Sequence, residues 1–240
     1  MMQRLMVSVL ICLLATPVFA TNFTDLPDDF VPNTQTVEQI QPAREQNRDL
    51  TFWNDEGELL TLFPSLVFEG FDNTLVGMGE MMGCLGMISS TTDDECFEPG
   101  TIVEGIEIGA LPDSALYVVI GEQAFGNFTP WIGPNTFEDA LVARFDPPVA
   151  AFGCMFQMAI VACDINMEIY GPSGLIGTDT IFASMNTFWG VSNSADEMIT
   201  EIIFTTALGE PKLVDYVWFG DGETVATQEA TWDQLKSFYK

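Results

Sequence analysis

The chain has 240 residues, of which 35 are Asp or Glu, only 7 are Lys or Arg and none is His, so its formal net charge is −28 at pH 7. The lack of His excludes Ser-His-Asp and Cys-His catalysis and any metal site that depends on imidazole. So few cations exclude a basic surface for nucleic acid, and the negative charge disfavours anionic membranes. The remaining chemistry is that of carboxylates, which bind hard cations, contact sugars or are simply hydrated.

Residues 1–20 have the pattern of a secretory signal peptide. Arg4 gives the positive start, an apolar run follows over residues 5–14, and Pro17 stands shortly before Ala20, where small residues mark a cleavage site. The apolar run is shorter than the roughly 20 residues that a membrane-spanning helix needs. We therefore expect cleavage near Ala20, a secreted or periplasmic protein and no transmembrane segment. Loss of Arg4 would leave 7 − 1 = 6 cationic residues against 35 acidic ones.

Residues 21–64 are predicted to be a polar N-terminal extension. They include Pro27, Pro32 and Pro42, and no helical or strand periodicity is sustained across them. We expect the folded domain to begin after this segment.

Residues 65–220 have the sequence pattern of an all-β domain. Short runs rich in β-branched and aromatic residues alternate with Gly, Pro, Asn and Asp, without helical patterns between them. Apolar and polar residues alternate over 165–169, Gly171-Pro172-Ser173-Gly174 then gives a strong turn signal, and Asp146-Pro147-Pro148 is expected to be a break. The expected strands are 65–71, 101–108, 115–120, 140–145, 149–158, 165–170, 175–182, 187–191, 198–205 and 213–219. About ten short strands predict one antiparallel β-sandwich of jelly-roll type.

Residues 221–240 are expected to form a polar linker and a short amphipathic C-terminal helix. Thr231, with Gln234 three residues later, has the spacing of a capping box. Trp232 and Leu235 would lie on one apolar face of that helix. We expect the helix to dock on its own domain, and a tail that docks on a partner is the alternative.

Four cysteines remain once Cys12 leaves with the signal peptide, and an oxidising compartment favours disulfides. Three pairings are possible, and we expect the one between sequence neighbours. Cys84 and Cys96 would close a polar loop. Cys154 and Cys163 would bridge the ends of an apolar stretch that folds back as a hairpin. A zinc site of all four thiolates is the alternative, but it lacks a close C-x2-C pair.

The segment 67–220 resembles a group of β-sandwich domains, largely uncharacterised, from secreted bacterial proteins, some of which carry sorting tails of the PEP-CTERM type. The matching motifs are FEGFD (68–72), CFEPGTIV (96–103), IGPNTF (132–137), FDPPVAAFG (145–153), IYGPSGLIG (169–177), FWGVS (188–192) and VDYVWFG (214–220). The resemblance covers about two thirds of the chain and implies a jelly-roll fold like that of carbohydrate-binding modules. It implies no established activity, and no sorting tail is seen here.

The resemblance also suggests a structural calcium ion, because carbohydrate-binding sandwiches often hold one where the first and last strands meet. Glu69 and Asp72 belong to the first predicted strand and its end, and Asp215 belongs to the last. Ca²⁺ takes about six to eight oxygen ligands, which these carboxylates and nearby carbonyls could supply. We expect a calcium site there, and exposed strand-edge acids are the alternative.

A sugar-binding surface is the second candidate site. Trp131 lies in a Pro- and Gly-rich segment, where an exposed ring could stack on a sugar. Asn135 and Glu138 follow closely and offer hydrogen bonds. Packing of the Trp131 ring in the core is the alternative.

Glycoside hydrolysis is the one catalytic chemistry left, since it needs only a pair of carboxyl groups. Glu104 with Glu107, or Glu168 with Glu201, are conceivable pairs, but acids that alternate with apolar residues are also what an outward strand face looks like. We therefore expect no catalytic residues and predict a secreted, non-catalytic module that binds glycan or a cell-surface component and is stabilised by calcium. An acidic extracellular-matrix protein and a carbohydrate-active hydrolase are the alternatives.

Overall fold

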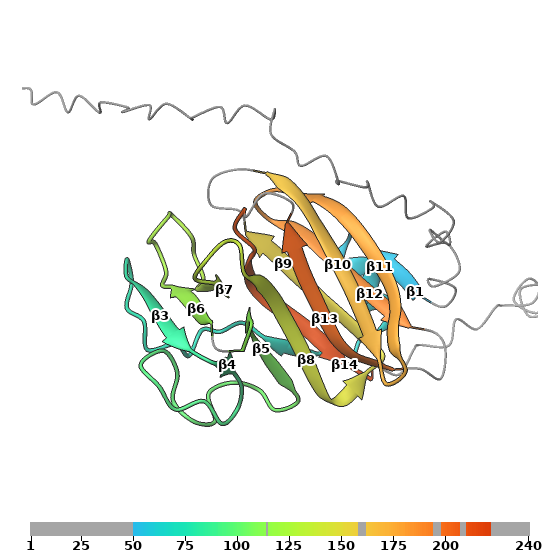
Figure 1. The fold of residues 1–240 in the computed structure, drawn as a ribbon, viewed down its shortest axis with the longest axis horizontal. Coiled ribbons are helices and arrows are strands. Elements are labelled where there is room, and N and C mark those ends of the chain that lie inside the picture. Colours follow the sequence, from blue (N-terminus) through green and yellow to red (C-terminus); the bar gives the residue numbers. More distant parts are fainter. Residues whose placement is uncertain (1–49, 114, 158–161, 194–197, 207–209, 222–240) are drawn as a thin grey trace, which may run out of the picture. The chain divides into compact units, whose positions relative to one another are not determined.

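Two antiparallel β-sheets pack face to face in the part of the chain that the structure describes (Figure 1). This computed structural model describes residues 50–113, 115–157, 162–193, 198–206 and 210–221. Fourteen strands and one helix lie in those ranges, and the strand pairings between them are antiparallel. The predicted all-β sandwich is confirmed.

The two sheets differ in size. The eight-stranded sheet has the order β1 (Leu50–Trp53), β12 (Thr187–Asn193), β9 (Ala151–Gln157), β14 (Leu213–Gly220), β7 (Trp131–Pro134), β6 (Leu116–Ile120) and β3 (Met81–Leu85), and β2 (Val67–Glu69) pairs with β14. The six-stranded sheet has the order β11 (Gly174–Ala183), β10 (Cys163–Gly171), β13 (Ile199–Thr206), β8 (Ala140–Val149), β5 (Ile106–Leu111) and β4 (Met87–Ile88). The predicted strands are all present, while β1, β3, β4 and β7 were not predicted.

The main core lies between the sheets and is rich in aromatic rings. Phe204 of β13 packs edge-on against Trp189 of β12, with ring centroids 5.7 Å apart. Its ring also lies 5.5 Å from Phe156 and 6.2 Å from Phe152, both in β9. All four side chains are fully buried. Because burial of one such side chain contributes about 1.5–3 kcal/mol, this cluster is a large part of what holds the layers together.

The folded part begins earlier than predicted, at β1, which pairs with β12. Asp55 then caps the helix α1 (Glu56–Leu62), accepting a hydrogen bond of 2.9 Å from a backbone N–H of the first turn. The fully buried Leu59 fixes the helix on the sheet at Gly153, where an added Cβ would come within 2.8 Å of the Leu59 side chain. The prediction that 50–64 belong to the extension is therefore wrong, because these residues have apolar contacts with the sandwich.

The predicted break at Asp146-Pro147-Pro148 does not end a strand. β8 continues to Val149 and pairs with β13 both there and at Arg144, with a shift of register between these positions. The prolines therefore lie in an irregular part of the strand, where their missing N–H groups interrupt no regular ladder.

Several predictions concern residues outside the described ranges. The signal peptide, most of the N-terminal extension and the C-terminal helix fall in residues 1–49 and 222–240, which the structure does not describe. Of the residues described, none forms a helix that is long and apolar enough to cross a membrane.

Candidate functional site

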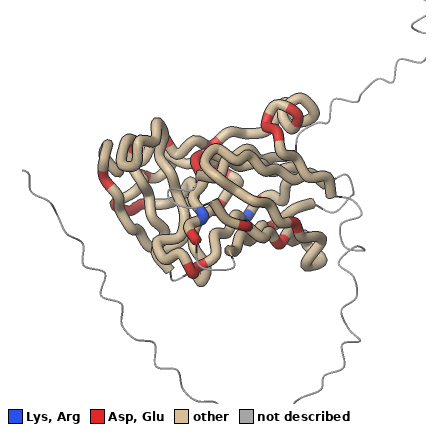
Figure 2. Tube along the Cα trace, turned by 90° about the horizontal axis from the view of Figure 1, so that it is seen from above, with Lys and Arg blue, Asp and Glu red and all other residues tan. Residues whose placement is uncertain are grey.

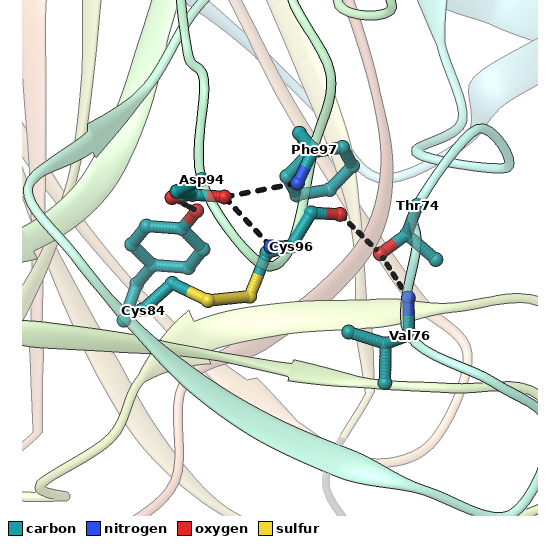
Figure 3. Close-up of a disulfide and its surroundings, with 7 residues drawn as sticks. Thr74, Val76, Cys84, Asp94, Cys96 and Phe97 are labelled. Atoms are coloured by element: carbon teal, nitrogen blue, oxygen red, sulfur yellow. Dashed lines mark hydrogen bonds between the residues drawn. A yellow bond between two sulfur atoms is a disulfide. The ribbon is translucent and has the colours of Figure 1, made fainter.

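One disulfide shapes the loop that leads into β5. Cys84 of β3 is bonded to Cys96, as predicted (Figure 3). Cys154 and Cys163 are buried free thiols, so the prediction of a second disulfide is wrong. Their strands, β9 and β10, belong to different sheets and form no hairpin. Burial raises the pKa of both thiols, which disfavours the reactive thiolate form. The Cys84–Cys96 bond also removes two thiolates from the alternative zinc site.

Asp94 organises the same loop (Figure 3). Its Oδ1 accepts hydrogen bonds from the backbone N–H groups of Cys96, at 2.7 Å, and Phe97, at 2.9 Å. Its Oδ2 accepts a hydrogen bond of 2.6 Å from the hydroxyl of Tyr117 in β6. Burial and this contact with Asp94 raise the pKa of the Tyr117 phenol. The carboxylate therefore ties the disulfide loop to the eight-stranded sheet.

The tip of this loop forms one wall of an open pocket. The backbone N–H of Ser89 donates to the Thr92 hydroxyl at 2.8 Å, and the N–H of Gly100 donates to the carbonyl of Ser90 at 2.7 Å. The pocket encloses about 710 Å³ at one end of the six-stranded sheet. Its lining residues are Ser89, Ser90, Thr91, Gly105, Ile106, Glu107, Arg144, Phe145, Asp146, Tyr170, Gly171, Pro172, Gly174, Thr200 and Glu201.

Four of these residues form a row across neighbouring strands. Glu107 of β5 lies opposite Arg144 of β8. Arg144 lies opposite Glu201 of β13, and Glu201 lies opposite Tyr170 of β10. Their sequence neighbours Ile106, Ala143, Ile202 and Ile169 are buried in the core, so the row is on the outward face of the sheet.

The guanidinium of Arg144 is fixed by two carboxylates. Its Nε donates to Glu201 at 2.7 Å, and its two terminal nitrogens donate to Asp113 at 3.0 and 3.2 Å. The hydrogen bonds with Asp113 and Glu201 raise the pKa of Arg144, and the hydrogen bond with Asp113 makes the larger contribution. Because both ends are held, the guanidinium is presented to the pocket in one orientation.

Tyr170 is the partly exposed aromatic side chain of the pocket. Its hydroxyl donates to Glu168, two residues earlier on the same strand, at 2.8 Å. This hydrogen bond raises the pKa of the phenol. The backbone turns directly after it, and Gly174 closes the turn with a φ of 114°, a conformation that favours glycine. The turn therefore leaves Tyr170 at the rim, beside Glu201.

No family model and no curated protein matches the chain. The function has to be inferred from the chain's own geometry.

The three expected calcium ligands do not form one cluster. In the described part of the chain, their carboxylate oxygens do not all come within 4.8 Å of one another. Glu69 is buried, and its two oxygens accept hydrogen bonds from the N–H groups of Phe71, at 2.6 Å, and Val103, at 2.9 Å. Glu69 therefore holds the backbone at Phe71 and Val103 together, whereas Asp72 is exposed on the surface.

Asp215 is the unusual member of the three. It is 8% exposed, and its Oδ2 accepts a long hydrogen bond of 3.3 Å from the Gln157 amide. Its Oδ1 is buried and has no hydrogen-bond partner in the described structure. Burial above all, with a contribution from the charge of Asp72, raises the pKa of Asp215, while Thr129 and Gln157 oppose the rise.

The expected sugar platform at Trp131 is wrong. This side chain is only 2% exposed, because its segment forms β7 inside a sheet and not a loop. Its ring stacks on Phe125 at 6.5 Å and packs with Ile120 and Leu213. Asn135 and Glu138 are exposed, but neither lines the pocket.

Sequence reasoning did not single out Tyr170 or Arg144. A usable signal was present, since the inward positions of Ile165, Met167 and Ile169 place Tyr170 outward, directly before a turn. No spacing in the sequence connects Tyr170 with Glu107 or Arg144, because the row depends on which strands are neighbours.

Proposed function

We propose that this chain is a secreted, non-catalytic β-sandwich that binds extracellular glycan in the open pocket at the end of the six-stranded sheet. The row Glu107, Arg144, Glu201 and Tyr170 carries the proposal. A sugar presents an apolar ring face and a rim of hydroxyl groups, which suit an aromatic ring beside planar hydrogen-bonding groups. The volume of about 710 Å³ lies within the usual range for ligand sites.

The lining of the pocket favours a ligand rich in hydroxyl groups over an apolar one. Ser89, Ser90 and Thr91 form one wall, and hydroxyl groups can both donate and accept hydrogen bonds. Arg144 is already held in place, so a ligand loses little affinity in ordering it. These features support recognition by many polar contacts.

A glycan array with three forms of the mature chain tests the proposal. Wild type should bind a subset of glycans, and Tyr170→Ala should weaken binding by about tenfold, because stacking of the ring is lost. Phe182→Ala is the matched control, since Phe182 is 69% exposed on β11 and does not line the pocket. Tyr170→Phe, which keeps the ring, separates stacking from a folding defect. An array without signal, or equal binding by all variants, contradicts the proposal.

A structural matrix protein is the second candidate. The observation that favours it is the acidic surface, since the described part has many carboxylates and only Arg144 and Lys212 as cationic side chains (Figure 2). A matrix role needs no glycan pocket. If the chain binds no glycan on the array in the presence of Ca²⁺, the result favours this candidate.

A hydrolase is not what we propose, although Glu107 and Glu201 lie two strands apart, which places their Cα atoms about 9.5 Å from each other. Inverting glycosidases use comparable separations between carboxyl groups, but one of these must act as an acid. Glu201 accepts a charge-assisted hydrogen bond from Arg144 at 2.7 Å, which suits a fixed binding group better than an acid. Release of reducing ends from a bound glycan, abolished in Glu201→Gln, would contradict the proposed non-catalytic role.

Export is part of the proposal and depends on the pattern in residues 1–20. Expression of the full chain in a bacterial host, followed by mass spectrometry of the exported protein, should find Thr21 as the first residue. An uncleaved protein retained in the cytoplasm would contradict this part.

We also propose that calcium stabilises the fold at Asp215. The buried Oδ1, which has no hydrogen-bond partner in the described structure, supports this, because an unsatisfied buried oxygen is costly and a cation would relieve that cost. Millimolar Ca²⁺ should raise the melting temperature of wild type above that in EDTA, and Asp215→Asn should abolish the difference. Asp164→Asn, at an exposed position of β10, is the control. A wild-type melting temperature that does not respond to Ca²⁺ contradicts the idea.

A further inference from the structure

The pocket carries more negative than positive charge. Glu107, Asp146 and Glu201 line it, with Arg144 as the one cation among its lining residues. The charge of Arg144 is already matched, since it hydrogen-bonds Glu201 inside the pocket and Asp113 beside it. Glu107 and Asp146 are both exposed and take no part in either contact. Among the described residues, the pocket therefore presents to a ligand two carboxylates that form no ion pair with Arg144.

No other cation among the described residues serves these carboxylates. Lys212 is the only other Lys or Arg there, and it is 1% exposed. Its Nζ donates to the carbonyl oxygens of Phe137, at 2.6 Å, and Glu210, at 3.1 Å, and burial lowers its pKa. It is a structural group outside the pocket.

We propose that the glycan bound in this pocket is cationic, an oligosaccharide of sugars with free amino groups. The inference rests on the proposed glycan-binding function and adds the class of ligand. Amino groups on the sugar would contact Glu107 and Asp146, and a sugar ring would stack on Tyr170, whose face also attracts cations. Uronate or sulfated glycans carry the wrong charge for this surface, and the net charge of −28 repels them at a distance.

The ligand has to be longer than one sugar. Glu107 and Tyr170 stand three strands apart in the row, which separates their Cα atoms by about 14 Å. A single pyranose ring cannot contact both side chains, whereas an oligomer can stack on Tyr170 and reach Glu107 with a later amino group. Binding should therefore increase from monomer to tetramer.

Calorimetry with two matched tetramers tests the charge. The β-1,4-linked glucosamine tetramer and its fully N-acetylated counterpart share a backbone and differ in their amino groups. The glucosamine tetramer should bind at least about tenfold more tightly near pH 6, and added salt should weaken its binding. Glu107→Gln and Asp146→Asn should each weaken its binding several-fold and weaken binding of the acetylated tetramer less, because only the glucosamine tetramer loses an ion pair. Asp164→Asn, an exposed acid outside the pocket, is the matched control.

The outcomes separate this inference from the proposed function. If the acetylated tetramer or other neutral glycans bind as well as the glucosamine tetramer, the pocket binds glycan but the inference about charge is wrong. If no glycan of any charge binds, the proposed function itself fails. If Asp164→Asn weakens binding as much as Glu107→Gln, the contact is with diffuse surface charge, which overturns the site. Tetralysine binding as tightly as the glucosamine tetramer would show that the pocket recognises charge alone and would also overturn the assignment.

Discussion

Removing the Cys84–Cys96 disulfide should lower the free energy of unfolding by about 3 kcal/mol. The bridge closes a loop with a sequence separation of 12, and the chain-entropy relation for a loop of this length gives about 3 kcal/mol at 25 °C. In a domain of about 150–250 residues, each kcal/mol shifts the melting temperature by about 2–4 °C. The double variant Cys84→Ser/Cys96→Ser should therefore melt about 6–12 °C below wild type.

Scanning calorimetry of both proteins, with and without reductant, is the assay. Reductant should lower the melting temperature of wild type toward that of the double variant and leave the variant unchanged, because Cys154 and Cys163 are already free thiols. Thiol titration gives an independent check. The unfolded mature chain should react at two thiols without reductant and at four after reduction.

A double variant that melts within about 2 °C of wild type would refute the reasoning. It would show that Asp94 alone, through its hydrogen bonds with Cys96, Phe97 and Tyr117, restrains the loop. Four reactive thiols without reductant would refute the bridge itself. Because Ser90 and its neighbours line the pocket from this loop, loss of the bridge should also weaken glycan binding.

Three further changes test single contacts. Asp215→Asn in EDTA should raise the melting temperature at pH 7 by about 2–4 °C, because the pKa of Asp215 is raised in the folded state and its charged form is disfavoured there. The gain should shrink as the pH falls through the folded-state pKa and wild type becomes protonated, so a gain that is constant down to pH 3 would contradict the assignment. Tyr117→Phe should lower the free energy of unfolding in urea by about 1–3 kcal/mol, because Asp94 Oδ2 loses its hydrogen-bond donor. An unchanged urea midpoint would show that water replaces the hydroxyl. Gly105→Ala should lower the free energy of unfolding by about 1–2 kcal/mol, because Gly105 has a φ of 97°, which favours glycine. Gly83→Ala, on the exposed edge strand β3, is the control and should lower it less. Equal losses in the two variants would exclude backbone strain as the cause.

The clearest of the strands predicted from the sequence has a period of two. In β10, Ile165, Met167 and Ile169 alternate with polar residues, and the structure buries those three positions. β7 was missed because Trp131-Ile132-Gly133-Pro134 contains the two residues most typical of turns, yet all four positions are buried. Its prediction required knowledge of the neighbouring strands, which protect a short segment with weak intrinsic preference for strand.

The helix α1 was missed for a different reason. Its local signals were present, since Asp55 is a good N-cap and acidic residues follow in the first turn. A helix of seven residues is not stable alone and forms because Leu59 packs on the sheet. Such tertiary stabilisation leaves only a faint pattern in the sequence.

The candidate pocket was beyond the reach of sequence reasoning because it depends on register. Glu107, Arg144, Glu201 and Tyr170 come from four strands, and their alignment is set by pairings between segments far apart in the chain. A register shift of one residue in any strand would turn that side chain to the other face. The disulfide between Cys84 and Cys96 was predicted from their closeness in the sequence, but the same reasoning wrongly paired Cys154 with Cys163, whose strands belong to different sheets.

The scarcity of cations connects the stability of the fold with the chemistry of the pocket. Arg144 is held by two carboxylates, and the buried Lys212 donates to carbonyl oxygens, so the two can neutralise few of the surrounding acids. The repulsion that remains is screened over about 10 Å at 0.1 M salt and about 3 Å at 1 M. Added NaCl should therefore raise the melting temperature and at the same time weaken binding of the glucosamine tetramer. Opposite responses from one cause are a strict test, because a melting temperature that falls with salt would mean that attraction, not repulsion, dominates among these charges.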